Sequence, residues 1–210
     1  TNKTFIKQFG RCNFSSIENT LEAFSIEAVS DAFYDEFKPR FDKLLDSIES
    51  DSNISEEVKQ DFTLLFVIRV LFLGFIQKKG WLGSEKFLQN LWQEYKANNR
   101  QNEFYIRWLE PLFFESLNSC PVTPVRPNDN EFSKETEKNL KMAPYLNGEL
   151  FKRKGGVDNL SLFLPDEAIG NFFDFLFQYN FTINENTAFD EELELNPEFL
   201  GIIFEKFVNK

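Results

Sequence analysis

The sequence contains no histidine, two cysteines and one methionine among its 210 residues. The absence of histidine excludes enzymes that use an imidazole as general base or as the partner of a nucleophile. Cys12 and Cys120 cannot assemble a zinc site without histidine, because such sites usually take four Cys or His ligands. The N-terminal residues do not form a secretory signal, so we expect a cytoplasmic protein with free thiols.

Long apolar runs and positive charge are also scarce. The longest apolar run, residues 63–76, contains Arg69 and is shorter than the ~20 residues that a membrane-spanning helix needs. The sequence therefore predicts no membrane span. The net charge is −11, and affinity for nucleic acid comes largely from Lys and Arg at phosphates. Any DNA contact is therefore expected to be local. A chain that begins at Thr1 is also expected to be a piece of a longer protein.

The motifs that usually carry chemistry are missing or weak. The one glycine pair, Gly155-Gly156, follows three basic residues and no convincing strand, so a flexible basic turn is favoured over a nucleotide loop. Glu-x-Lys strings typical of metal-dependent nucleases occur at 36–38, 57–59 and 94–96, but all lie on predicted helices, where solvated helix faces explain them. The acidic stretch 190–194 is predicted to be exposed. We predict no catalytic, cofactor-binding or metal-binding residue.

The 27 phenylalanines predict a core packed with aromatic rings. Apolar residues recur at helical spacing over 25–48, 55–79, 84–97 and 102–117, with Pro39 and Pro111 expected to kink or restart their helices. The segment 55–79 begins with Ser-Glu-Glu and ends with two lysines and Gly80, which are helix start and stop signals. It is apolar on nearly every face, so we place it at the centre of the bundle.

The second half of the chain reads as more irregular. Three prolines and no periodicity predict an exposed loop over 118–142, and a short strand is expected at 160–164. Helices are predicted from Pro165 and from Asn196 to the chain end, and 181–184 could pair with 192–195 as a hairpin. The predicted fold is mainly α, an irregular helical bundle around 55–79 with a small β element in the C-terminal third. Its parts are the bundle (1–117), the loop (118–142) and a helical continuation (143–210).

Two basic spots are the candidates for contact with a DNA backbone. They are Lys78 and Lys79 at a helix end, and Lys152, Arg153 and Lys154 in a stretch (141–160) with a net charge of +2, from four basic and two acidic residues. Each spot has a simpler explanation, because lysines complement a helix C-terminus and basic turns are normally solvated. Trp81 is expected to be a core anchor rather than a base-stacking platform.

Several segments, taken in order, resemble one protein family. AVSDAFYDEF at 28–37 is similar to its V-(S/T)-x-x-F-Y-x-E-(F/Y) helix, and RVLFLGFIQKKGWL at 69–82 to its R-x-L-F-x-x-F-(L/I)-Q-K-K-G-W-L stretch. LEPLFFESL at 109–117, PYLNGELF at 144–151, YNFTINEN at 179–186 and NPEFLGIIFEKF at 196–207 follow, with Glu149 in place of a usual glycine. The chain resembles the helical N-terminal or connector region of type IIG restriction-modification enzymes and related phage-defence (BREX-type) adenine-specific DNA methyltransferases.

The resemblance implies that the last helix leads into a methyltransferase domain, with a cofactor loop and an N-P-P-(Y/F) catalytic motif, that this chain does not contain. Asn196-Pro197 is the nearest approach to that motif, but Glu198 follows where the second proline is needed. The chain itself would be noncatalytic, while its parent protein would use S-adenosylmethionine to methylate adenine, with or without cleaving DNA. Its partners would be DNA, through the parent protein, and the downstream domain.

Two other functions remain open. An acidic helical scaffold that binds other proteins and has no role at DNA would suit the charge balance. An acidic DNA mimic would need carboxylates spaced like phosphates, but here they are dispersed among basic residues.

Overall fold

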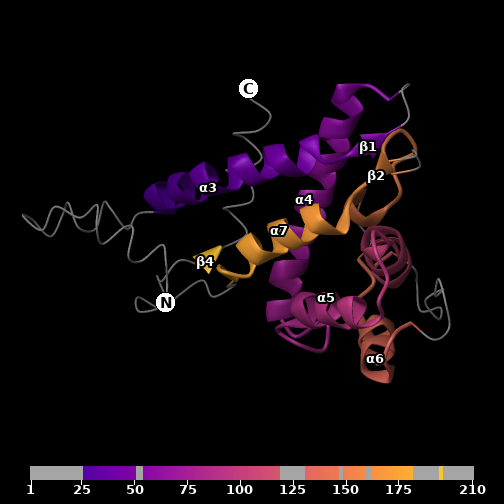
Figure 1. The fold of residues 1–210 in the computed structure, drawn as a ribbon. Helices are drawn as coiled ribbons and strands as arrows, with labels where there is room; N and C mark the ends of the chain where they lie inside the picture. Colours follow the sequence, from indigo (N-terminus) through magenta and orange to yellow (C-terminus); the bar gives the residue numbers. More distant parts are fainter. Residues whose placement is uncertain are drawn as a thin grey trace, which may run out of the picture.

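Helix α4 (Glu56–Lys78) is the central element of the fold, as the sequence predicts. The computed structural model describes residues 26–50, 54–118, 131–146, 149–158, 162–181 and 194–195. Ser55 caps α4 by accepting the N–H of Val58, and Gly80, at φ +73°, ends it by donating to the carbonyl of Gln77. Thirteen of its residues are buried, because three helices cross it at different levels (Figure 1): α3 (Ile26–Asp46), α5 (Phe87–Ala97) and α7 (Asp166–Leu176).

Helix α4 is also long and apolar enough to cross a membrane, judged by length and composition alone. In this fold, 72% of its most apolar 18-residue window is buried inside the protein. The burial matches what the core helix of a helical bundle shows.

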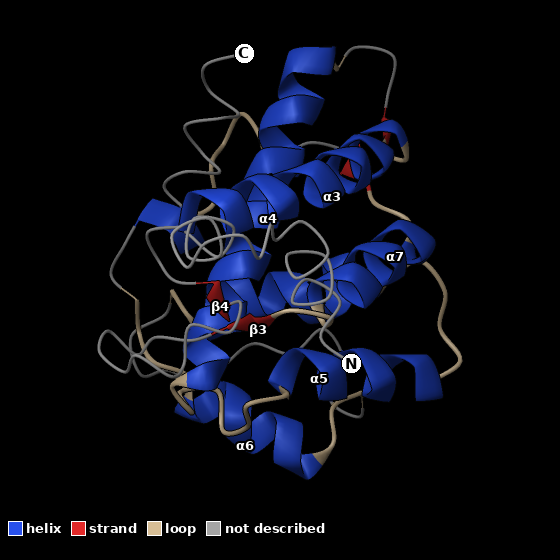
Figure 2. Cartoon of the chain, turned by 90° about the vertical axis from the view of Figure 1, so that its left-hand side faces the viewer, coloured by secondary structure: helices blue, strands red, loops and turns tan. Residues whose placement is uncertain are grey.

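Phenylalanine rings join α4 to the two helices that cover it. α3 (Ile26–Asp46) continues through Pro39 as one helix, so the predicted restart there is wrong. α7 (Asp166–Leu176) begins after Pro165, as the sequence predicts. Phe37 of α3 and Phe66 of α4 both contact Phe172 of α7, with ring centroids 6.2 and 6.3 Å apart. The core therefore unites residues from the first and last thirds of the chain. Figure 2 shows α3, α4 and α7 from the side.

The chain from 104 to 117 is helical but widened. It contains two π-helical turns, η1 (Tyr105–Leu109) and η2 (Leu112–Ser116), on either side of Pro111. Pro111 has no N–H, so it cannot close the ordinary hydrogen bond to the carbonyl four residues earlier. Just before it, the N–H of Glu110 donates to the carbonyl of Tyr105, five residues earlier. The predicted restart at Pro111 is thus a pair of π-turns.

The prediction of a loop over 118–142 is wrong for its second half. Helix α6 (Lys134–Met142) begins at Ser133, whose hydroxyl accepts the N–H of Thr136. It packs beside α5 (Phe87–Ala97) and η2 at the lower end of the molecule (Figure 1). Residues 119–130, which hold the three prolines, lie outside the described residues.

The strands are short. β1 (Glu49–Ser50) pairs antiparallel with β2 (Leu162–Phe163), which the sequence predicts as a strand, and η3 (Glu149–Phe151) is a 3₁₀ turn. β3 (Asn180–Phe181) pairs with β4 (Glu194–Leu195) in parallel, so the predicted hairpin is wrong. The helix predicted from Asn196 lies outside the described residues.

Candidate nucleic-acid interface

The basic loop at 150–158 is shaped by a buried arginine of α4. Arg69 donates from Nε to the carbonyl of Leu150 at 2.8 Å and from one terminal nitrogen to the carbonyl of Lys152 at 3.2 Å. Its guanidinium also pairs with both carboxylate oxygens of Asp158, at 2.6 and 2.8 Å. Asp158 in turn accepts the backbone N–H of Lys154 at 2.8 Å. One α4 side chain thus fixes both ends of the loop.

This ion pair is fully removed from solvent. The side chains of Arg69 and Asp158 are 1% and 0% exposed, and the guanidinium also lies 4.8 Å from the ring centre of Phe114. A buried charge is tolerated only when it is paired and hydrogen-bonded, and the bidentate contact meets that need. The arrangement is structural, because it leaves neither group open to a ligand.

The basic side chains of the loop are largely occupied by neighbouring carboxylates. Lys152 pairs with Glu149 at 2.5 Å, and this hydrogen bond raises the pKa of Lys152 and lowers the pKa of Glu149. Arg153 pairs with Glu110 at 2.6 Å and lies over the Phe114 ring, 4.1 Å from its centre. Lys154 is exposed, and its side chain forms no ion pair with the residues described.

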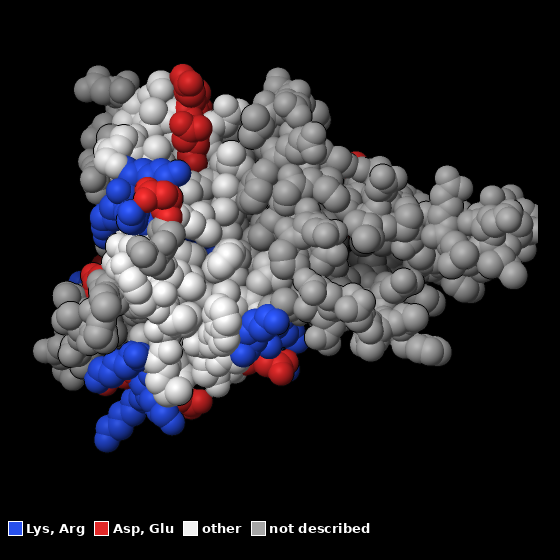
Figure 3. All heavy atoms as spheres, turned by 180° about the vertical axis from the view of Figure 1, so that it is seen from behind, with Lys and Arg blue, Asp and Glu red and all other residues white. Residues whose placement is uncertain are grey.

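The second basic spot lies at the end of α4. Lys78 pairs with Glu85 at 3.2 Å, whereas Lys79 is exposed. Trp81 is 48% exposed, so the prediction of a core anchor is wrong. Gly80 ends the helix one residue earlier, and the turn that follows carries Trp81 at the surface, while Leu82 takes the buried position. On the face in Figure 3, basic side chains form separate groups beside acidic ones rather than one continuous surface.

Tyr105 and Glu115 are among the residues of the π-turns that have a buried polar side-chain atom with no hydrogen-bond partner in the described part of the chain. Burial raises the pKa of the Tyr105 hydroxyl, and the charge of Glu110 adds to this effect. Burial also raises the pKa of the Glu115 carboxyl, although the nearby Arg153 opposes the shift. One carboxylate oxygen of Glu115 has no hydrogen-bond partner in the described part of the chain. Glu115 therefore destabilises the fold when it is ionised.

Replacing Glu115 by Gln is expected to raise the free energy of unfolding at pH 8 by a small amount, because it removes a partly solvated charge that burial disfavours. The raised pKa of Glu115 means that the folded state holds its proton longer than the unfolded state, so stability falls as pH rises past about 4.3, the ordinary value. Denaturant unfolding at pH 4 and pH 8 measures this difference. The exposed control Glu85→Gln should change little, and an equal gain at both pH values would contradict the explanation.

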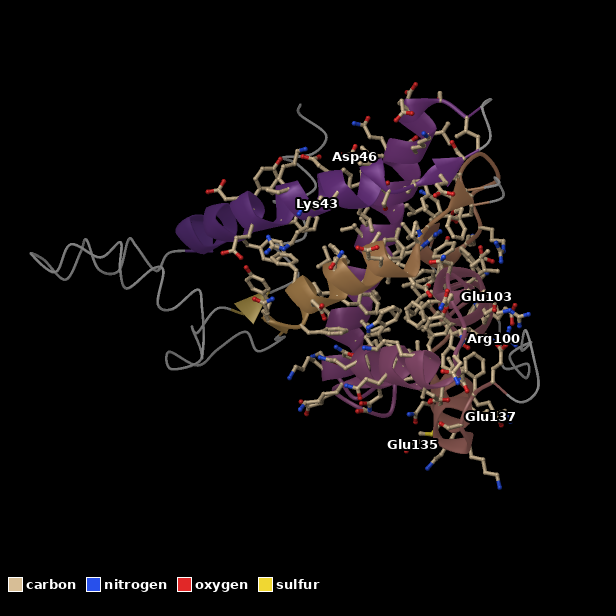
Figure 4. All side chains as sticks on the ribbon, viewed as in Figure 1. Lys43, Asp46, Arg100, Glu103, Glu135 and Glu137 are labelled. Carbon is tan, nitrogen blue, oxygen red and sulfur yellow. The ribbon has the colours of Figure 1, made fainter. Side chains whose placement is uncertain are left out.

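A closed ring of four charges anchors the residues just before α6. Glu131 pairs with Arg100 at 2.6 Å and with Arg107 at 2.9 Å, and both arginines also pair with Glu103. Arg100 and Glu103 appear together beside α5 in Figure 4. Glu94 holds the following turn by accepting the Ser133 and Thr136 hydroxyls at 3.0 and 2.6 Å. The start of α6 is therefore fixed by polar contacts.

A cavity of about 270 Å³ lies between α3 and α7. Lys43 and Arg40 line it together with Glu167, and Lys43 and Asp46 are labelled on α3 in Figure 4. The Arg40 guanidinium is committed elsewhere, because it lies 4.4 Å from the Phe175 ring centre and donates to the carbonyl of Glu36. The negative charge of Glu167 in the lining would also repel a bound anion, so the cavity is a poor anion site. Among the described residues, no group of His, Cys, Asp or Glu could hold a metal ion.

One comparison with known proteins gives a result. The chain is 35% identical over 167 residues to a protein of Methanocaldococcus jannaschii named "Putative type II restriction enzyme and methyltransferase". The match covers 79% of this chain but only 14% of that protein. No family model matches the chain, and no solved structure is significantly similar to it. The similarity relates the chain to restriction-modification enzymes.

Proposed function

We propose that this chain is a noncatalytic helical part of a larger adenine-specific DNA methyltransferase of the restriction-modification type. It would support the catalytic domain and contact the DNA backbone. The parent protein would use S-adenosylmethionine, act in the cytoplasm and belong to the type IIG or phage-defence (BREX-type) enzymes that the sequence motifs resemble.

The observation that carries this proposal is the 167-residue similarity to a protein whose name contains both activities, restriction enzyme and methyltransferase. This chain spans 14% of the length of that protein, so most of the relative's length lies outside the similarity. The chain contains no cofactor loop and no N-P-P-(Y/F) motif. A supporting role beside a catalytic domain reconciles these facts.

The division of the chain follows from the proposal. The described residues of 1–117 and 143–210 share one apolar core, to which Phe132 and Leu140 also belong, so they would act with α6 as one supporting body. The residues after 195 would lead towards the methyltransferase domain. Of the five predicted DNA-backbone candidates, Lys79 and Lys154 are exposed and form no ion pair with the described residues, so these two have the charge most available for phosphate.

The test is a methyl-transfer assay on the full-length protein that contains this chain. We expect labelled methyl groups from S-adenosylmethionine to reach adenine in duplex DNA, and we expect the 210-residue chain alone to transfer none. A full-length variant altered in the downstream N-P-P-(Y/F) motif is the matched control, and it should lose transfer while keeping its fold. Methyl transfer by the isolated chain, or a parent sequence without that motif, would contradict the proposal.

The net charge of −11 favours one alternative, an acidic scaffold that binds proteins and has no role at DNA. In that case the full-length protein would methylate DNA with unchanged affinity when every exposed lysine of this segment is neutralised. DNA titrations of such variants separate the two functions.

A further inference from the structure

The solvent face of α6 carries three lysines in a single row. Lys134, Lys138 and Lys141 follow one another at steps of four and three residues, so they fall within about 60° of one another around the helix axis. All three are exposed. The opposite side carries the buried Thr136, Asn139 and Leu140. We call Lys134, Lys138 and Lys141 the lysine row.

The lysine row has three lysines that form no ion pair with the described residues, whereas the basic spots at 78–79 and 152–154 have one each, Lys79 and Lys154. Lys78, Lys152 and Arg153 are each neutralised by a carboxylate 2.5–3.2 Å away. No lysine of the row forms an ion pair with the residues that the structure describes. The acidic residues of α6, Glu135 and Glu137, lie on either side of the row rather than within it, and Figure 4 labels both on this helix.

The base of the lysine row is fixed in place. The N-terminal turn of α6 is capped by Ser133 and held by Glu94, and its buried side packs so closely on the turn after α4 that a Cβ on Gly83 would lie 2.1 Å from Oδ1 of Asn139. In the back view of Figure 3, where α6 lies at the lower left, basic side chains project from this part into solvent. The three charges therefore stand on a defined surface rather than on a loop.

The spacing of the lysine row suits a polyanion. Seven residues of α-helix rise about 10 Å, and one strand of duplex DNA places a phosphate every ~3.4 Å along its axis, so the row spans about three phosphates. Lysine binds phosphate as a point charge and needs no particular base sequence.

We propose that the lysine row binds the phosphodiester backbone of duplex DNA. The inference rests on the proposed function and specifies which surface of the chain would meet the DNA. It makes α6, rather than the loop at 152–154, where two of the three basic side chains are paired with carboxylates, the main backbone contact. Because phosphate contacts carry no sequence information, the row would add affinity without changing the recognition site.

The test compares two triple variants of the full-length protein that change the net charge equally. Lys134, Lys138 and Lys141 are replaced by Gln, which keeps helix propensity close to that of Lys. Lys38, Lys43 and Lys59, which lie on α3 and α4, are replaced by Gln as the control. Binding to a duplex is measured between 50 and 200 mM salt. The slope of log K against log salt should become shallower by about 2 to 3 in the row variant, since each phosphate contact contributes about 0.9.

The outcomes separate this inference from the proposed function. If the wild-type protein binds duplex DNA and the row variant keeps the wild-type slope, the lysine row is not a DNA contact, while the proposed function stands. If both triple variants lose the same slope, overall charge explains the effect and the inference is overturned. If the wild-type protein shows no salt-dependent binding to the duplex, both proposals fail. Stronger binding of the row to single-stranded RNA would likewise overturn the choice of duplex DNA.

Discussion

Replacing Arg69 by Met is expected to lower the free energy of unfolding by about 3–5 kcal/mol, because it leaves a buried charge without its partner. Asp158, whose side chain is 0% exposed, would keep only the N–H of Lys154. The carbonyls of Leu150 and Lys152 would lose their donor. Methionine fills part of the volume but supplies no donor. Urea unfolding of the wild type and the variant measures the loss, and the loop 150–158 should become open to proteolysis.

Arg153→Met is the matched control for this prediction. Both arginines lie against the Phe114 ring and pair with a carboxylate, but the side chain of Arg153 is 40% exposed. An exposed pair contributes about 0–1 kcal/mol, so the control should lose far less stability than Arg69→Met. The double variant Arg69→Met, Asp158→Asn removes the stranded charge and should recover part of the loss. Equal losses in the two single variants would show that stacking on Phe114, not the buried charge, stabilises the loop.

The local signals of α4 are what made the fold predictable. Ser55 caps its start and Gly80 ends it, as the sequence indicates. Its apolar faces required other helices around it, and α3, α5 and α7 supply them. The structure confirms the mainly α fold with a small β element. This fold could be predicted because the signals for its helices lie within single segments and do not depend on distant contacts.

The sequence does not predict helix α6, because the contacts that fix it are mainly polar. Its buried side consists of Thr136, Asn139 and Leu140, so the apolar periodicity that marks a helix is nearly absent. Ser133 is a good cap, but the prolines between 121 and 127 suggested a continuous loop. The anchoring carboxylate of Glu94 is 39 residues away from Ser133, a pairing that no local pattern reveals.

The candidate site was predicted only in part, for the same reason. The basic residues at 152–154 are visible in the sequence, but the carboxylate of Glu110 that neutralises Arg153 lies 43 positions away. Arg69 gave a usable signal, since a charge inside a buried apolar run must find a partner. The identity of that partner, 89 positions later, depends on the fold.

Replacing Gly83 by Ala is expected to destabilise the protein by about 2 kcal/mol or more, through backbone strain of about 1–2 kcal/mol and a steric clash. Gly83 has a φ of +78°, a conformation that residues with a Cβ rarely adopt. The new Cβ would lie 2.1 Å from Oδ1 and 2.6 Å from Cγ of Asn139, so the α6 side chain must move from its buried place. Thermal or urea unfolding measures the total.

Gly80→Ala isolates the strain from the clash. Gly80 has nearly the same φ, +73°, but a Cβ there would meet nothing within 4 Å. It should therefore cost about 1–2 kcal/mol from strain alone. The double variant Gly83→Ala, Asn139→Ala removes the clashing side chain. Its free energy of unfolding should therefore lie below that of Asn139→Ala by the strain alone, about 1–2 kcal/mol. Equal losses in the free energy of unfolding for Gly83→Ala and Gly80→Ala would mean that the Asn139 side chain moves away at little cost and that α6 is not tightly packed against the turn. A larger loss for Gly83→Ala would mean that the turn after α4 fixes the position of α6, and with it the direction in which the lysine row faces.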